Sequence, residues 1–466
     1  MQQLPTRGAR GLRLRATGAP FLGLPRLCGE VFHCCLPNAD LSTSSRYKWW
    51  VVFMLWWICF FNYADRQGMS AVFPELERAF HFSKSQLGLI GSAFMWVYAG
   101  ASLISGPICD RFRRRDLILG GCLFWSTVTL MTGWCTSVGQ FVTVRALEGL
   151  GETFYFPASM SLASDYHPAG TRSRALAWHQ SSVYAGTILG SWATAWLAMR
   201  YGWRTGFYVF GLAGVGLALC LNRFLQEPVR GASDQQSPAQ TGAKVRPLGI
   251  SDTLRAVFAD HSILLLMLAF ALANSVAGVF LVWSPTFLKE KFHYNLAIAG
   301  LSGTVFIHLA SAVSVPLAGW MADHWALRVR GGRVLVQAMG LLFGAAFVFQ
   351  VGHTTESNTL IASMVCFGLG KGFYDSGIFA TLYDTVEPRA RGTVVGLMNM
   401  VGWGGGALGP WMVGWIADHG RRATAIANMS EAISWGGAIY LMAAALLLVT
   451  VWVRNSGSGR LRQLPN

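Results

Sequence analysis

The sequence predicts an all-α integral membrane protein in which twelve transmembrane helices form two six-helix, pseudo-symmetric bundles. Three observations predict this fold: an apolar composition, regularly spaced arginine clusters and an internal repeat. Of the 466 residues, 53% are hydrophobic and only 13% are charged, whereas soluble domains carry about 25% charged residues. Apolar stretches of membrane-spanning length recur along the chain, and they are too long for the strands of a barrel.

The apolar stretches form two sets of six, separated by a polar segment. Residues 226–249 are rich in Pro, Gln, Ser and Gly, which is typical of a flexible linker, and a short amphipathic helix is expected at 250–260. The expected spans are 48–68, 86–108, 117–136, 139–164, 175–199, 204–225, 262–287, 296–322, 334–352, 358–383, 393–418 and 432–453.

These spans give an N-terminal bundle at 47–225, a linker with its short helix at 226–260 and a C-terminal bundle at 261–454. Residues 1–46 form an Arg-rich tail that resembles a transit segment in composition, although we favour a disordered cytoplasmic tail. Residues 455–466 form a second short tail.

Arginine clusters fall in every second loop, as the positive-inside rule requires of cytoplasmic loops. This pattern places both termini in the cytoplasm, with a plasma (inner) membrane as the expected location. It also accounts for the net charge of +15 without a nucleic-acid partner. The clusters are Arg111, Arg113, Arg114 and Arg115; Arg172 and Arg174; Arg223, Arg230 and Arg246; Arg328, Arg330 and Arg333; Arg389 and Arg391; and Arg454.

Two segments of the first half recur in the second half at nearly the same offset. Gly149-Leu-Gly-Glu-Thr-Phe-Tyr155 returns as Gly368-Leu-Gly-Lys-Gly-Phe-Tyr374, and Gly106-Pro-Ile-Cys-Asp110 returns as Gly319-Trp-Met-Ala-Asp323. The repeat indicates a duplicated six-helix unit, which is a known plan of transporters. Within it one position changes sign, from Glu152 to Lys371.

The motif Gly106-x-x-x-Asp110-Arg111-x-x-Arg114-Arg115 after the second of twelve spans resembles the major facilitator superfamily. The resemblance covers about 48–454. It departs from the family pattern at Arg113, where a Gly is usual, and at His324, which replaces the Arg in the second copy. The resemblance implies alternating access, with spans one, four, seven and ten lining a central cavity.

Two branches of the superfamily remain open. Asn62-Tyr63-Ala64-Asp65-Arg66 and Gly149-x-Gly151-Glu152 are similar to the anion:cation symporter branch, which carries organic acids and sugar acids. They are also similar to the Spinster-like branch, which carries lysolipids and related amphiphiles. Phe156-Pro157-Ala158 favours the anion branch.

Span four carries Arg145, Glu148 and Glu152 on one helical face. An ionised side chain at mid-bilayer costs about 2.5–3.5 kcal/mol, so this face should meet a cavity or partners. Burial lets a carboxyl bind and release a proton near neutral pH, and we assign Glu152 to proton coupling. For Arg145 and Glu148 we favour a structural pair that holds helices together.

Span one ends with Asp65-Arg66. The planar guanidinium of Arg66 suits an anionic substrate, and Asp65 is a second candidate for proton coupling. The alternative is an ion pair at the membrane surface.

Span ten carries Lys371 and Asp375, four residues apart. Either they neutralise each other, or Lys371 attracts the substrate anion and Asp375 adjusts the strength of that attraction. Tyr155 and Tyr374 are candidate hydrogen-bond donors to the same substrate.

The sequence of the loop after span two predicts a gate. Its arginines would pair with acids or helix ends of the other half when the cytoplasmic side is closed. Positive-inside topology is the simpler explanation, and both can hold. The candidate gate residues are Gly106, Asp110, Arg111, Arg114, Arg115, Gly319 and Asp323.

Together these features predict a secondary transporter of a small organic anion, proton-coupled and monomeric. The Spinster-like alternative predicts an apolar cavity wall, for which Phe154, Phe156 and Phe373 are suited. In the empty cavity, Glu152 and Lys371 are expected to attract each other until an anion binds Lys371. No nucleophile–base pair, metal-ligand spacing or nucleotide loop stands out, so we expect no enzyme activity, metal or cofactor.

Overall fold

The structure is a computed structural model that describes residues 46–228, 250–386 and 391–455. Over these residues the chain forms sixteen α-helices. Residues 1–45 and 456–466 of the predicted tails, and most of the linker, lie outside the described residues.

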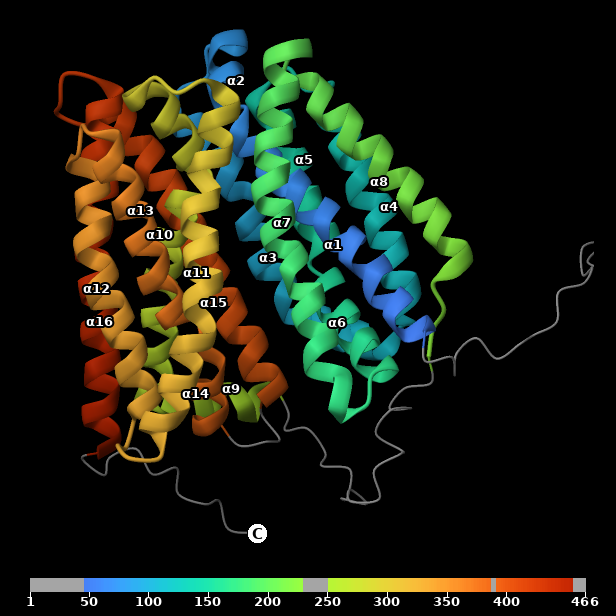
Figure 1. Ribbon diagram of the computed structural model, residues 1–466, viewed down its shortest axis with the longest axis vertical. Coiled ribbons are helices and arrows are strands. Elements are labelled where there is room, and N and C mark those ends of the chain that lie inside the picture. Colours follow the sequence, from blue (N-terminus) through green and yellow to red (C-terminus); the bar gives the residue numbers. More distant parts are fainter. Residues whose placement is uncertain (1–45, 229–249, 387–390, 456–466) are drawn as a thin grey trace, which may run out of the picture. The chain divides into compact units, whose positions relative to one another are not determined.

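The first half contains α1 (Tyr47–Ala71), α2 (Phe73–Phe80), α3 (Lys84–Arg111), α4 (Arg114–Thr132), α5 (Val138–Glu152), α6 (Tyr155–Tyr166), α7 (Ala169–Tyr201) and α8 (Arg204–Phe224). The second half contains α9 (Ile250–Ala259), α10 (His261–Phe292), α11 (Leu296–Ala326), α12 (Gly332–His353), α13 (Ser357–Asp375), α14 (Ile378–Thr385), α15 (Arg391–His419) and α16 (Ala425–Asn455). Figure 1 shows the two halves in separate colour ranges, blue to green and yellow to red.

Twelve spans account for fourteen of these helices, because the fourth and tenth spans are each divided in two. The fourth is α5 followed by α6, and the tenth is α13 followed by α14; the remaining two helices, α2 and α9, are short. Six helices are long and apolar enough to cross a membrane by length and composition alone: α3, α8, α10, α11, α12 and α16. The twelve-helix, two-bundle fold agrees with the fold class predicted from the sequence.

The division of span four has a local cause. Pro157 lies four residues after Thr153, where α5 has just ended. Proline lacks the N–H that would bond the carbonyl of Thr153, and its ring crowds that carbonyl. The span expected at 139–164 is therefore made of two helices instead of one. Span ten is divided at Ser376–Gly377, where glycine lowers helix stability.

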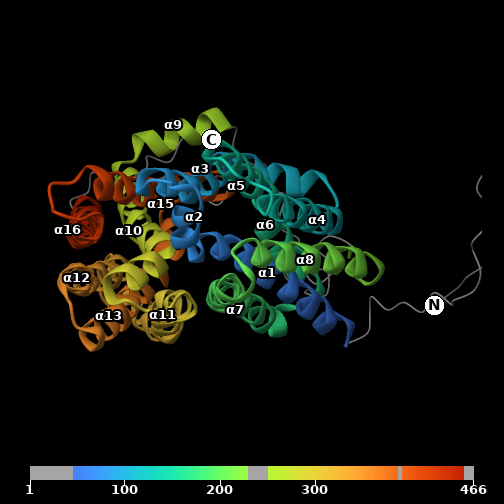
Figure 2. The same ribbon diagram turned by 90° about the horizontal axis from the view of Figure 1, so that it is seen from above.

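The two halves meet at two contacts that the repeat relates to each other, between spans two and eleven and between spans five and eight. α3 of the first half packs on α15 of the second, and α7 packs on α11. Close packing is visible at Gly88, where an added Cβ would lie 2.8 Å from the carbonyl oxygen of Pro410. Figure 2 shows α3 beside α15 when the helices are viewed end-on.

We call the end of the helices near α2 the α2 end, and the opposite end, near α9 and α14, the α9 end (Figure 1). At the α2 end, ion pairs join the halves. Lys84 of α3 is only 4% exposed and pairs with Glu290 of α10 and with Glu77 of α2. Lys289 pairs with Glu75 across the same junction, with 2.7 Å between Nζ and Oε1.

Asp418 of α15 completes this junction by capping the start of α3. The Ser83 hydroxyl and the Gln86 side chain form a capping box there. Asp418 accepts hydrogen bonds from the backbone N–H groups of Lys84 (3.1 Å) and Ser85 (2.7 Å), and from the Ser85 hydroxyl (2.6 Å). The first N–H groups of a helix have no partner within the helix, so the second half supplies partners that the first half lacks. We call Lys84, Glu290, Ser85 and Asp418 the α2-end lock.

Candidate functional site

The fourth span and the first span meet in a buried ion pair between Arg66 and Glu152. Arg66 Nη2 lies 2.7 Å from Glu152 Oε2, and Arg66 Nε donates to the same oxygen at 3.2 Å. The side chains are 5% and 0% exposed. In a medium of low dielectric constant such a pair is strongly coupled, and loss of either partner leaves an uncompensated charge.

Four aromatic rings surround the guanidinium of Arg66. The carbon Cζ lies 4.5 Å from the ring centroid of Tyr63, 4.4 Å from Phe94, 5.4 Å from Tyr98 and 5.3 Å from Trp403. These distances permit cation–π attraction. Trp403 belongs to α15, in the second half, and its ring centroid lies 4.8 Å from that of Tyr98. Arg66 therefore contacts both halves.

Sequence reasoning did not select these aromatic residues. The chain has 29 Phe, 19 Trp and 12 Tyr, so an aromatic side chain on a span carries little information by itself. Tyr63 could have been selected from the sequence, because it lies three residues before Arg66 on the same helix and therefore close to it on the helix surface.

Arg145 and Glu148 form a second ion pair one turn before Glu152, with side chains 4% and 2% exposed. Cζ of Arg145 lies 4.9 Å from the ring centroid of Phe94, the ring that Arg66 also contacts. The hydroxyl of Thr129 lies 3.5 Å from Glu148 Oε1. This pair ties α5 to the aromatic cluster around Arg66.

Asp65 is the unpaired charge of the site. It is 3% exposed, and neither carboxyl oxygen has a hydrogen-bond partner among the described residues. The charged groups around it are Glu148, Glu152 and Arg145. A buried, ionised carboxylate without a hydrogen-bond partner is costly.

Lys371 and Asp375 form an ion pair on α13, with side chains 20% and 38% exposed. In this structure Glu152 and Lys371 each have a nearer partner, Arg66 and Asp375 respectively, and they are not paired with each other.

Tyr155 and Tyr374 are both almost fully buried, at 1% and 2% exposure. The Tyr155 hydroxyl donates to the backbone oxygen of Leu55 at 2.7 Å and lies 3.0 Å from Nε2 of His179. The Tyr374 hydroxyl has no partner among the described residues. The Tyr155 side chain therefore links α6 to α1 and α7.

The arginines of the predicted gate loop bond within their own half in this structure. Arg114 pairs with Asp165 and, at 3.1 Å, with Glu227. Arg115 donates to the backbone oxygen of Leu225 (2.6 Å) and to Asn222 (2.8 Å), beyond and within the last turn of α8. Arg111 is exposed.

The second half repeats the Arg114–Asp165 pair at the equivalent positions. Arg333 pairs with Asp384 and also with Asp323, at 2.8 Å. The offset that relates Gly149–Tyr155 to Gly368–Tyr374 also relates Asp165 to Asp384 and Arg114 to Arg333, and the structure shows that both arginines pair with these acids. At the predicted gate glycines Gly106 and Gly319 an added Cβ would meet nothing within 4 Å. The side chain of Asp110 is outside the described part.

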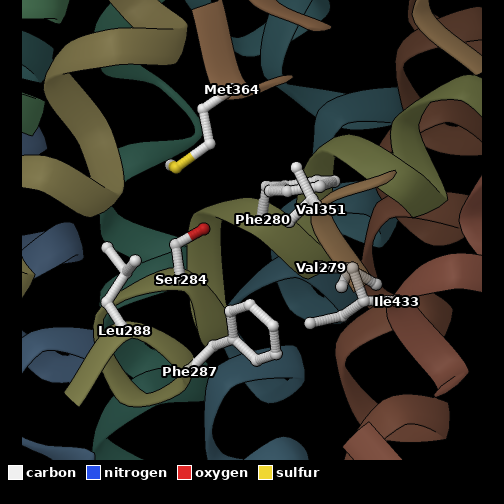
Figure 3. Close-up of a pocket in the computed structure, with 8 residues that line it drawn as sticks. All are labelled: Val279, Phe280, Ser284, Phe287, Leu288, Val351, Met364 and Ile433. Carbon is white, nitrogen blue, oxygen red and sulfur yellow. The ribbon is translucent and has the colours of Figure 1, made fainter. Parts of the chain in front are cut away.

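A small apolar cavity lies inside the second half, between α10, α12, α13 and α16 (Figure 3). Its volume is about 10 Å³, and it is lined by Val279, Phe280, Ser284, Phe287, Leu288, Val351, Met364 and Ile433. A volume of this size is close to the minimum for a single water, so this cavity is a packing gap rather than a substrate site. Over the residues that the structure describes, no group of three or more His, Cys, Asp or Glu is placed to hold a metal.

Two bundles of long helices, with a buried ion pair that contacts the second bundle through Trp403, are the architecture of an integral, multi-pass membrane protein. The sequence matches the family model of the Major Facilitator Superfamily over residues 55–410 and 307–464. The chain belongs to this superfamily and is a transporter, not an enzyme, as the resemblance noted from the sequence implied.

Several relatives are named as transporters of anions. The chain is 27% identical to the chloroplastic ascorbate transporter of Arabidopsis thaliana, over 90% of this chain and 77% of that protein. It is 28% identical to the chloroplastic sodium-dependent phosphate transport protein 1 of the same plant, over 82% and 78%. It is 27% identical to the D-galactonate transporter of Escherichia coli O6:H1 (strain CFT073), over 87% and 97%.

Among solved structures, the chain is similar to a bacterial homologue of the human lysosomal transporter Spinster in an inward-facing, unoccupied conformation. The TM-score is 0.76 at 20% sequence identity, over 90% of this chain and 100% of that one. At this identity the likeness establishes the shared fold.

Proposed function

We propose that this transporter moves a small organic anion by alternating access and couples the movement to protons. The observation that carries the proposal is the buried Arg66–Glu152 pair beside the unpartnered Asp65. A guanidinium presents a planar set of donors that matches a carboxylate. An incoming anion would therefore compete with Glu152 for Arg66.

Proton coupling follows from this competition. Protonation of Glu152 removes its negative charge and frees Arg66 for the substrate anion. Conversely, when Glu152 ionises, it regains Arg66 and favours release of the anion. Asp65 offers a second place for a proton close by. Lys371 would attract the anion from the second half, with Asp375 as its resting partner.

We further propose that the α9 end faces the cytoplasm, together with both termini, in a plasma (inner) membrane. Arg113 lies between α3 and α4 at that end, and Arg114 and Arg115 begin α4. Arg328 and Arg330 lie between α11 and α12. The positive-inside rule supports this orientation. The α2-end lock would then close the outer side in this conformation.

The test is uptake into proteoliposomes under an imposed pH gradient, with labelled D-galactonate, ascorbate and phosphate as probes. We expect Glu152→Gln to abolish accumulation against the gradient while exchange of substrate across the membrane persists. Asp116→Asn is the matched control, since Asp116 is 51% exposed at the α9 end. Intact accumulation in Glu152→Gln would exclude Glu152 as the coupling group.

The same assay separates the two substrate classes. The aromatic rings around Arg66 are also suited to the head group of a charged amphiphile. Inhibition of uptake by lysolipids, with no inhibition by sugar acids, would favour transport of an amphiphile over transport of an organic acid.

A further inference from the structure

A second pocket lies at the α2 end of the second half, at the loop after α15, away from the Arg66 site. Its volume is about 630 Å³, within the range of about 300–1,000 Å³ that small-molecule sites occupy. α10, α12, α16 and the loop between α15 and α16 contribute to it. Its ionisable side chains are the basic Lys291, His353 and Arg422 and the acidic Glu431.

Lys291 is the cation of this pocket that lacks an acidic partner among the described ion pairs. Its Nζ donates to the backbone oxygen of Gly352 at 2.6 Å and lies 4.9 Å from the ring centroid of Phe287. These contacts use only part of its donor capacity, because an ammonium has three N–H groups. Arg422, by contrast, makes a two-point contact with Glu431, at 2.8 and 3.3 Å.

The pocket is apolar on its outer side. Phe349 and Trp435 line it and are 53% and 63% exposed. α10 ends at Phe292 and α12 ends at His353, so the pocket is level with the helix ends, where a bilayer changes from hydrocarbon to head groups. Tryptophan is enriched at this depth in membrane proteins.

We propose that this pocket binds an anionic phospholipid, with the head-group phosphate at Lys291 and an acyl chain along Phe349 and Trp435. The charge of Lys291 complements a phosphodiester, and the exposed rings complement the chain. The lipid would join the ends of α10, α12 and α16, three helices of the second half.

The test uses purified full-length protein in neutral detergent, titrated with phosphatidylglycerol, phosphatidylcholine or inorganic phosphate. Bound lipid is counted by native mass spectrometry, and the melting temperature is followed in parallel. We expect phosphatidylglycerol alone to bind and to raise the melting temperature. In Lys291→Gln its affinity should fall about fivefold, the effect of about 1 kcal/mol per basic residue near a lipid head group.

Three variants keep the result interpretable. Lys291→Arg should retain binding, which separates lost charge from lost packing. Trp435→Ala, at an exposed position, should weaken binding without lowering the melting temperature of the lipid-free protein. Arg421→Gln is the matched control, because it removes one positive charge from the loop between α15 and α16, and Arg421 does not line the pocket. Unchanged phosphatidylglycerol binding in Lys291→Gln would overturn the proposal, as would equal stabilisation by inorganic phosphate alone.

Discussion

Arg66 is the residue on which the contacts of the candidate site converge. It pairs with Glu152 of α5, touches rings of α1 and α3, and lies over Trp403 of α15. A change in the charge of Glu152 or in the position of α15 would therefore change the contacts of Arg66.

We expect Arg66→Lys to raise the half-saturating substrate concentration by about tenfold or more, because an ammonium cannot replace the planar two-donor contact. The folded protein should survive, since the positive charge opposite Glu152 is kept. Uptake kinetics measure the effect. Arg204→Lys, beside Trp203 at the α2 end, is the control, and equal kinetics in both variants would refute a substrate role for Arg66.

Neutralising Asp65 should not destabilise the protein, whereas neutralising Glu152 should. Asp65→Asn replaces an unpartnered buried carboxyl by an amide of the same shape, so we expect an unchanged or higher melting temperature. Glu152→Gln leaves Arg66 without its counter-charge, and we expect a loss on the order of 3–5 kcal/mol. Thermal unfolding at pH 8 compares the two. Equal destabilisation would contradict the unpaired state of Asp65.

The adjacency of Asp65 and Arg66 shows what sequence could not resolve. Neighbouring residues on a helix point about 100° apart, so the two charges face different surroundings. The chain gives the positions of Arg66 and Glu152 on two helices, but not the distance between those helices. The pairing was decided by packing of α1 against the fourth span, which no local pattern encodes.

At the scale of elements, the repeat is more informative than the apolar pattern. The apolar runs and the internal echo were enough to predict twelve spans in two bundles, and this fold class is confirmed. Pro157 was visible in the sequence and should have signalled the end of α5. The equivalence of Arg114 and Arg333, in contrast, became recognisable only when the structure showed that each pairs with the acid at the equivalent position.

These equivalent pairs differ in burial, and burial should decide their energies. The Arg114 side chain is 3% exposed and the Arg333 side chain 27%. We expect Arg114→Gln to cost on the order of 3–5 kcal/mol, because Asp165 and Glu227 lose a buried partner. Arg333→Gln should cost about 1 kcal/mol or less. Thermal unfolding of the two variants, each the other's control, is the measurement, and equal losses would refute the argument.

At the scale of the whole molecule, the α2-end lock joins the two halves. We expect Asp418→Ala to weaken the closed α2 end, because two N–H groups of α3 lose their acceptor. Spin labels at Arg78 and Arg421, one in each half, should then show a shift toward longer distances.

The control for this measurement is Asp116→Ala at the α9 end, which removes an exposed acid from a helix start in the first half. It should leave the label distances unchanged. An unaltered distance distribution in Asp418→Ala would mean that packing alone, including the close approach at Gly88, holds this end together.

The balance of buried charges at the site has a consequence for membrane voltage. Arg66 and Arg145 offset Glu152 and Glu148, so the empty site is neutral when Asp65 holds a proton. Under the proposed mechanism, one monoanion that enters with one proton leaves this sum unchanged, and the membrane potential neither drives nor opposes its passage. A second proton would add one elementary charge, worth about 2.3 kcal/mol per 100 mV. A measurement of the electrical current that accompanies transport would therefore give the number of protons that move with each anion.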